Sequence, residues 1–166
     1  MPVSLRPFTE SDADSLARNA NNPAIENWLN DGFPVPYGRA DAVGWISLAT
    51  AEKPYTMLAI DLDGEAIGSI GLYPQTNVLR RNIEMGYWLG EPHWGKGYAT
   101  RAIKMMTAYA FLEFPDVERV FARAFGNNTG SQRALEKAGF TREARLEKTV
   151  WKNGRWEDEL FYGIRR

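Results

Sequence analysis

The sequence predicts one α/β domain built on a single mixed, mostly antiparallel β-sheet. A helical pattern lies between the strand patterns at residues 82–89 and 117–125, and a connection of that length implies a parallel crossover. Asp63-Gly64 and Asn153-Gly154 each separate two strand patterns. Such pairs favour type I′ hairpin turns, in which both central residues have positive φ. A chain of 166 residues suits one domain, here residues 1–166.

The first half of the chain predicts one strand, three helices and a hairpin. Residues 3–8 form the strand pattern, and Thr9 and Asp12 have the spacing of a capping box that starts a helix ending near residue 20. Pro23 suits the first position of a second helix, through about residue 30. The remaining elements are a third helix over residues 39–51 and hairpin strands over 55–62 and 65–73.

The second half predicts the crossover and a final hairpin. Residues 82–89 alternate between apolar side chains and a second set containing Glu84. The period becomes that of a helix over residues 97–114, where apolar residues share one face. The remaining elements are a strand over 117–125, a helix over 128–138 capped by Asn128 and stopped by Gly139, and strands over 142–151 and 156–164.

Composition excludes several classes of function. Lys and Arg total 20 and Asp and Glu total 21, so no global charge attracts nucleic acid or anionic membrane. The chain has no cysteine and one histidine, His93, which argues against thiolate and multi-histidine metal sites. No apolar run approaches the roughly 20 residues of a membrane helix, and the start lacks a signal-peptide pattern. We therefore expect a cytoplasmic protein with no metal, nucleic-acid or membrane partner.

A glycine-rich loop, residues 90–100, joins the strand at 82–89 to the long helix. Gly95 and Gly97 permit close approach of the backbone to a ligand. The N-terminus of the helix adds partial positive charge, so consecutive amides there suit a phosphate group. The alternative is a tight strand-to-helix turn without a ligand.

Two common nucleotide motifs do not fit this loop. A P-loop requires Ser or Thr after the lysine that follows its second glycine, but Gly97 follows Lys96. The dinucleotide fingerprint requires Gly or Ala where Thr100 stands. A nucleotide-dependent kinase or hydrolase is therefore disfavoured.

Three segments together resemble the GCN5-related N-acetyltransferases (GNAT). The loop Trp94-Gly95-Lys96-Gly97-Tyr98-Ala99 is similar to the acetyl-CoA loop of that family. The blocks at residues 128–140 and 84–89 are similar to two further family segments and most resemble the branch that acetylates Ser or Ala at the N-termini of ribosomal proteins. The resemblance covers nearly the whole chain. It implies a central parallel strand pair that splays apart, flanked by helices.

The resemblance also implies how acetyl-CoA is bound as co-substrate. Residues 87–89 would pair with the pantetheine arm, the amides of residues 95–100 would surround the pyrophosphate, and Asn128 would bond the arm or nearby backbone. The full set implied is Tyr87, Trp88, Leu89, Gly95, Lys96, Gly97, Tyr98, Ala99, Thr100, Asn128 and Ser131.

Glu84 and Ser131 are the candidate catalytic residues. Attack of an amine on a thioester requires a base for the ammonium proton and an acid for the leaving thiolate. Glu84 shares a strand face with Gly86 and is the candidate base, directly or through water. The alternatives are a structural hydrogen bond or attraction of a cationic substrate. Ser131 is the candidate acid, with a helix-cap role as its alternative.

Two residues depart from the family pattern. Trp94 stands where many members have Gln or Arg, and we interpret it as a packing residue. Leu135 stands where many members have the Tyr that protonates the thiolate, which leaves that role to Ser131 or solvent.

The sequence thus predicts an acetyl-CoA-dependent N-acetyltransferase, monomeric or homodimeric, that acts by direct attack in a ternary complex. The acceptor is a primary amine, and the branch resemblance suggests a protein or peptide N-terminus. Two alternatives stay open. One is acetylation of a small amine such as a polyamine or aminoglycoside, and the other is a non-catalytic acyl-CoA-binding module.

Overall fold

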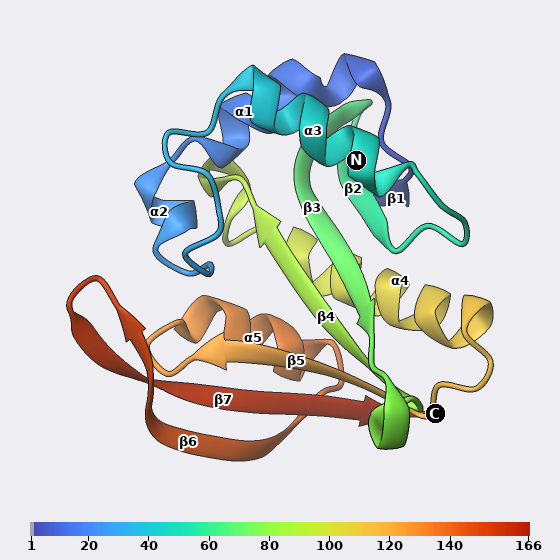
Figure 1. Ribbon diagram of the computed structural model, residues 1–166, viewed down its shortest axis with the longest axis vertical. Coiled ribbons are helices and arrows are strands. Elements are labelled where there is room, and N and C mark those ends of the chain that lie inside the picture. The colour runs from blue at the N-terminus through green and yellow to red at the C-terminus, as the bar shows by residue number, and fades with distance from the viewer. Residues whose placement is uncertain (1) are drawn as a thin grey trace. The chain divides into compact units, whose positions relative to one another are not determined.

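The computed structural model describes residues 2–166 (Figure 1). Two compact units are present, one formed by residues up to Gly71 with Tyr87–Ala102 and the other by Leu72–Gly86 with Ile103–Arg166. The helices are α1 Ala13–Ala20, α2 Pro23–Glu26, α3 Arg39–Ala49, α4 Tyr98–Glu113 and α5 Thr129–Lys137. The strands are β1 Ser4–Arg6, β2 Met57–Leu62, β3 Glu65–Pro74, β4 Asn82–Leu89, β5 Arg119–Phe125, β6 Thr141–Lys152 and β7 Arg155–Arg165. Short 3₁₀ turns are η1 Glu10–Asp12, η2 Asn77–Leu79 and η3 Glu91–His93.

The strands form one seven-stranded sheet in the order β1-β2-β3-β4-β5-β7-β6. The pairs β1–β2, β2–β3, β5–β7 and β6–β7 are antiparallel, whereas β4 and β5 are parallel. This confirms the mixed sheet and the crossover. The parallel ladder runs only from Asn82↔Arg119 to Glu84↔Phe121. Within the described chain, the later residues of β4 have no paired residue on β5, as expected for strands that splay apart.

The first unit buries its core between helices and the start of the sheet. Figure 1 shows α1 and α3 side by side near β2 and β3, and their apolar faces join one buried cluster. Leu16, Ile46 and Ala59 are each at most 5% exposed. The β2–β3 turn is tight because Asp63 and Gly64 both have positive φ, 55° and 88°, which confirms the hairpin predicted from their sequence.

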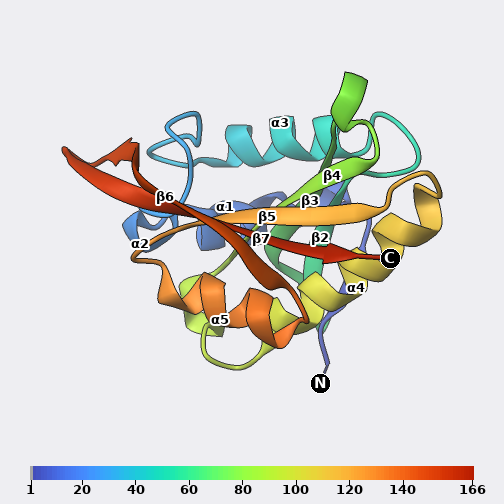
Figure 2. The ribbon, with the colours of Figure 1, turned by 90° about the horizontal axis from the view of Figure 1, so that it is seen from below.

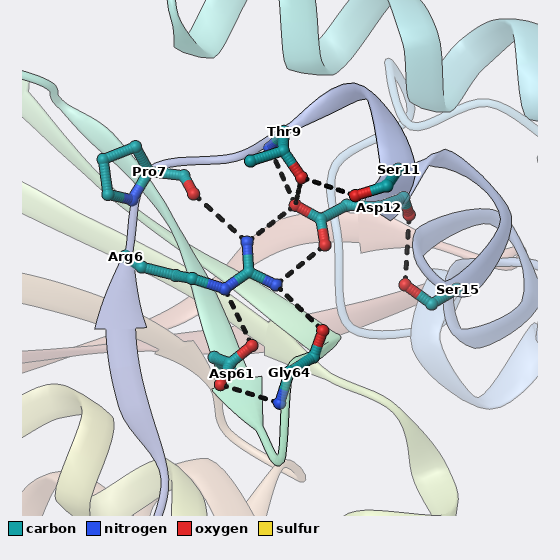
Figure 3. Close-up of polar contacts among 8 residues, drawn as sticks. All are labelled: Arg6, Pro7, Thr9, Ser11, Asp12, Ser15, Asp61 and Gly64. Carbon is teal, nitrogen blue, oxygen red and sulfur yellow. Dashed lines mark hydrogen bonds and ion pairs between the residues drawn. The ribbon is translucent and has the colours of Figure 1, made fainter.

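A polar cluster ties β1 to the start of α1 and to β2 (Figure 3). The Arg6 guanidinium donates to both carboxylate oxygens of Asp12 at 2.8 Å and to Asp61 Oδ1 at 2.8 Å. The Thr9 amide donates to Asp12 Oδ2 at 2.8 Å, which is half of the predicted capping box. All four groups are therefore satisfied, which indicates a structural rather than a catalytic cluster.

The second unit has one covered sheet face. Figure 2 shows α5 on one side of β5 and β7, and the residues facing that side, such as Val120, Ala122 and Tyr162, are at most 1% exposed. Strand alternation places Glu84, Phe121 and Arg123 on the opposite face. The rings of Phe121 and Phe161 stack there at 6.4 Å.

Several predicted elements are shorter than expected. The strands expected over residues 55–62 and 117–125 begin two residues later, at Met57 and Arg119, and the helix expected over 39–51 ends at Ala49. The helix from Pro23 ends at Glu26 rather than near residue 30, because Asn27, Asn30 and Gly32 follow, and these residues favour turns over helix. The first strand covers only Ser4–Arg6, because the chain turns toward α1 after Arg6, whose side chain is held in the polar cluster with Asp12 and Asp61. The prediction of a single domain over residues 1–166 stays a prediction.

Candidate active site

Hydrogen bonds fix the first turn of the glycine loop at its first residue, Gly90, and at its last, Trp94. The Gly90 amide donates to the Ile67 carbonyl at 2.8 Å, and a Cβ on Gly90 would lie 2.1 Å from Asn19 Oδ1. A side chain at this position, where β4 meets the loop, would therefore force Asn19 to move. The Trp94 indole N–H donates to the Leu89 carbonyl at 2.7 Å. Trp94 is thus hydrogen-bonded to the end of β4 while the residue remains 41% exposed, and its packing role stays a prediction.

Gly95 and Gly97 have backbone conformations that favour glycine, and the space around them is open. Their φ values are 73° and 79°, and a Cβ on either residue would meet no heavy atom within 4 Å. Helix α4 begins directly afterwards at Tyr98, so the amides of its first turn have no partner within the helix. The exposed Lys96 adds a cation. These are the features of an anion-binding helix N-terminus.

His93 lies in η3 just before this loop, and its Nδ1 is buried with no hydrogen-bond partner in the described chain. Burial, with a smaller contribution from Lys96, lowers the pKa of His93, although Glu65 opposes the change. The imidazole is therefore neutral at neutral pH. Among residues 2–166, no three His, Asp or Glu side chains gather as a metal centre requires.

Tyr87, Trp88 and Leu89 form the end of β4. The backbone there lies close to β3, because a Cβ on Gly68 would be 2.4 Å from the Trp88 carbonyl oxygen. The Trp88 ring packs edge-on against Phe33, with centroids 6.2 Å apart. Trp88 thus contributes its side chain to the aromatic packing, while Leu89 is 6% exposed. Contacts of these residues with a ligand stay a prediction.

The aromatic packing around Trp88 continues into the segment before α3. Phe33 stacks on Tyr37 at 5.1 Å. Burial, helped by the Asp41 charge, raises the pKa of Tyr37 to about 12, so its hydroxyl stays protonated. Trp45 packs against the same cluster, and its indole N–H is buried without a hydrogen-bond partner in the described chain.

Glu84 lies on β4 at the last paired position of the parallel ladder. Its Oε1 accepts a hydrogen bond from Arg123 Nε at 2.7 Å, and its side chain is 21% exposed. Arg123 also lies 3.6 Å from Glu159 Oε2, measured from Nη1. Glu84 is therefore hydrogen-bonded to a cation across the strands. The sequence analysis named a structural hydrogen bond as an alternative role of Glu84 but did not identify Arg123 as its partner.

Tyr73 is the neighbour of this group on the end of β3. A Cβ on Gly86 would lie 3.3 Å from the Tyr73 ring, so the small residue leaves room for that ring. Partial burial, and then the Glu84 charge, raise the pKa of Tyr73. The phenol is therefore a neutral group beside a carboxylate.

Asn128 and Ser131 lie at the start of α5. The side chain of Asn128 accepts a hydrogen bond from the Ser131 amide at 3.2 Å, which confirms the predicted cap. Leu135 is fully buried in the same helix, so it packs the core at the position where the family often has Tyr.

The predicted site residues are divided between the two units. Glu84, Asn128 and Ser131 belong to the second unit, whereas residues 87–89 and 95–100 belong to the first. Arg123 is the residue that the sequence analysis missed. The only available signal was the alternation of Arg119, Phe121 and Arg123 with small apolar residues along one strand.

Comparison with known proteins identifies the family. Residues 3–141 match the acetyltransferase (GNAT) domain family. YoaA of Bacillus subtilis, an uncharacterized N-acetyltransferase, is 34% identical over 165 residues, which cover 96% of this chain and 91% of YoaA. The chain therefore belongs to the acetyltransferase (GNAT) family, a family of acyltransferases.

Particular relatives refine this assignment. YjcK of B. subtilis is 38% identical over 102 residues, or 61% of this chain, but the match spans only 56% of YjcK. The ribosomal-protein-serine acetyltransferase of Escherichia coli is 26% identical over 106 residues, 64% of this chain and 58% of that protein. RimJ of Mycobacterium smegmatis in complex with CoA-disulfide has a TM-score of 0.83 and 29% identity, over 98% of this chain and 81% of that one. The resemblance to the ribosomal-protein branch is thereby confirmed.

No helix among residues 2–166 is both long and apolar enough to cross a membrane.

Proposed function

We propose that this protein transfers the acetyl group of acetyl-CoA to the α-amine of a protein or peptide. The observation that carries the proposal is the open glycine loop at the start of α4. A Cβ on Gly95 or Gly97 would meet no heavy atom within 4 Å, and the first amides of α4 have no partner within the helix. A pyrophosphate matches both the charge and the hydrogen-bond acceptors that such a site requires. The RimJ structure, which contains a CoA derivative, supports the same ligand.

The chain's own residues have distinct roles in this proposal. The amides of Gly95 to Thr100, with Lys96, hold the phosphates. The backbone of Tyr87 to Leu89, which follows the last pair of the parallel ladder at Glu84↔Phe121, pairs with the extended arm of the co-substrate. Asn128 fixes the first turn of α5 and thereby the position of Ser131. Acetyl-CoA itself supplies the activated acyl group, and no metal is required.

Glu84 accepts the proton that the acceptor must lose. An α-amine enters mostly as the ammonium, and only the neutral amine attacks a carbonyl carbon. The proton moves to Glu84, directly or through water, the new C–N bond forms, and the C–S bond breaks. The attacking nitrogen loses its second proton as the amide forms, and the thiolate gains a proton through Ser131, which passes one on and takes one back, or through solvent, because the buried Leu135 has no proton to give. The products are the amide, the CoA thiol and the proton held by Glu84. Glu84 is suited to this role because its carboxylate, on the sheet face opposite α5, remains 21% exposed.

The acceptor class is proposed from the relatives. The E. coli relative is named for acetylation of a ribosomal-protein serine, so a free N-terminal Ser or Ala is the first acceptor to test. We further propose a cytoplasmic monomer or homodimer without a nucleic-acid partner.

Incubation with acetyl-CoA and cell extract, followed by mass spectrometry of acetylated peptides, tests this function. We expect new acetylation at free protein N-termini that depends on the enzyme and on acetyl-CoA. Acetylation restricted to small amines would reject the acceptor class. Binding of acetyl-CoA without any acetylated product would favour a non-catalytic acyl-CoA-binding module.

A further inference from the structure

Arg123 is a cation placed beside the proposed base by three neighbouring strands. Its Nε donates to Glu84 Oε1 on β4 at 2.7 Å, and its Nη1 lies 3.6 Å from Glu159 Oε2 on β7. Glu84 and Glu159 are 21% and 13% exposed, and Arg123 is 46% exposed. The group therefore has two mostly covered carboxylates and one half-exposed guanidinium.

The position of Arg123 on β5 gives this contact a particular geometry. The backbone ladder between β4 and β5 ends at Glu84↔Phe121. Arg123 lies two residues further along β5, on the same face as Phe121. Its side chain thus reaches back across the strands immediately beyond their last backbone pair. Arg123 therefore bonds the Glu84 side chain from the side on which β4 and β5 separate.

Only one oxygen of Glu84 is used in this contact. Oε1 accepts from Arg123, and within residues 2–166 no hydrogen bond to Oε2 is found. A single bond through Nε restricts the rotation of the carboxylate and leaves its second oxygen available. A long side chain without such a bond would sample several rotamers.

We infer that Arg123 is a positioning residue that fixes Glu84 through Oε1, so that Oε2 receives the proton of the acceptor amine. This inference rests on the proposed function of Glu84 as the base. The proton passes from the ammonium nitrogen to Oε2, and no bond to Arg123 breaks in the step. Arg123 acts through Glu84 and does not touch the reacting atoms.

Glu159 adds a second negative charge. Arg123 can therefore bond Glu84 while the three side chains together keep a net negative charge. Burial acts to lower the pKa of Arg123, but the hydrogen bond that Arg123 donates to Glu84 and the charges of both glutamates outweigh it and raise the pKa. Arg123 therefore remains charged. Two carboxylates and one guanidinium sum to one negative charge, which suits an incoming ammonium. Tyr73, which also lies near Glu84, is neutral.

A double-mutant cycle tests this inference, because a residue that acts only through Glu84 has no effect once Glu84 is removed. We expect Arg123→Gln to lower kcat by about 10- to 100-fold, as for a displaced catalytic group, with the KM for acetyl-CoA unchanged. In a Glu84→Gln background the same substitution should change kcat less than about twofold. The difference between its effects in the two backgrounds measures the coupling between Arg123 and Glu84. Arg123→Met, which keeps the apolar stem, serves as the second variant.

Arg145→Gln is the matched control. It removes the ion pair of Arg145 with Asp158 on the adjacent strands β6 and β7, and it should leave kcat unchanged in both backgrounds. The inference is overturned if Arg123→Gln leaves kcat at the wild-type value, or lowers it by the same factor in both backgrounds. Failure of the proposed base is a separate result, since Glu84→Gln alone would then retain wild-type kcat.

Discussion

At residue 84, a carboxylate ends a parallel strand pair with one oxygen bonded and one available. If this carboxylate takes the ammonium proton, Glu84→Gln keeps the size of the side chain but removes the base. We expect kcat to fall by about 10²–10⁴-fold, the usual contribution of a general base, with little change in acetyl-CoA affinity. Activity should recover partly as pH rises, because free amine accumulates. Near-normal kcat at neutral pH would show that Glu84 only orients the substrate.

At residue 97, the backbone has a φ of 79° and no atom within 4 Å of a Cβ. Gly97→Val should place a branched side chain where a phosphate approaches. We expect the KM for acetyl-CoA to rise at least about tenfold, the value of one charge-assisted hydrogen bond. The kinetics of acetyl transfer measure this.

Gly154→Val is the matched control for backbone strain. Gly154 has a φ of 75° and equally open surroundings, but it lies in the β6–β7 turn. Both variants should lose similar stability, and only the change at Gly97 should weaken acetyl-CoA binding. Equal KM values in the two variants would reject the loop as the phosphate site.

The residue scale is also where sequence reasoning reached its limit. Alternation along residues 82–89 was enough to place Glu84 on the face opposite Ile83 and Met85. Its partner was not predictable, because the register of two parallel strands is set by packing over a long crossover rather than by any local pattern. The cap at Asn128 was predictable, since an N-cap depends on residues only three apart.

At the level of elements, the backbones of β3 and β4 lie so close together at Gly68 that a side chain there has no room. A Cβ on Gly68 would be 2.4 Å from the Trp88 carbonyl oxygen and 3.0 Å from the Leu89 Cα. Because both atoms belong to backbone, Gly68→Ala must shift one strand. We expect a loss of about 1–3 kcal/mol in the free energy of unfolding, measured by chemical denaturation.

Gly44→Ala in α3 is the opposite case. Gly44 is exposed, and a Cβ there meets nothing within 4 Å. Alanine should stabilise the helix by about 0.5–1 kcal/mol. If Gly68→Ala were as harmless as Gly44→Ala, the close approach of β3 and β4 would be contradicted.

Elements with a local cause were predicted well. The turns at Asp63-Gly64 and Asn153-Gly154 have the positive φ values that their sequence requires. The strand order was not predicted beyond its mixed character. The insertion of β7 between β5 and β6 depends on which apolar faces pack together, and neither hairpin pattern contains that information.

For the molecule as a whole, paired carboxylates control the stability at low pH. Burial acts to raise the pKa of Asp12, but hydrogen bonds from Arg6 and Thr9 outweigh it and hold that pKa below its ordinary value of 3.8. Arg6 remains charged throughout this range. A depressed carboxyl pKa stabilises the fold fully above the unfolded-state value. That contribution is lost as pH falls through the lower folded-state value.

Asp12→Asn should therefore destabilise the protein at neutral pH by about 3 kcal/mol, as expected when one partner of a mostly buried ion pair is removed. Between pH 7 and pH 3, the variant should lose less unfolding free energy than the wild type, because the wild-type linkage is absent. Asp14→Asn is the control, since Asp14 pairs with Arg39 on an exposed surface and should change stability by at most about 1 kcal/mol. A parallel pH dependence for wild type and Asp12→Asn would contradict this account.

Release of the CoA thiol with a synthetic peptide tests the proposed activity most directly. The peptide has a free N-terminal serine and no lysine, and its matched control is the same peptide with the α-amine already acetylated. We expect thiol release and one added acetyl group with the free peptide, and neither with the blocked one. Equal release with both peptides, or none with either while acetyl-CoA still binds, would contradict transfer of the acetyl group to an α-amine.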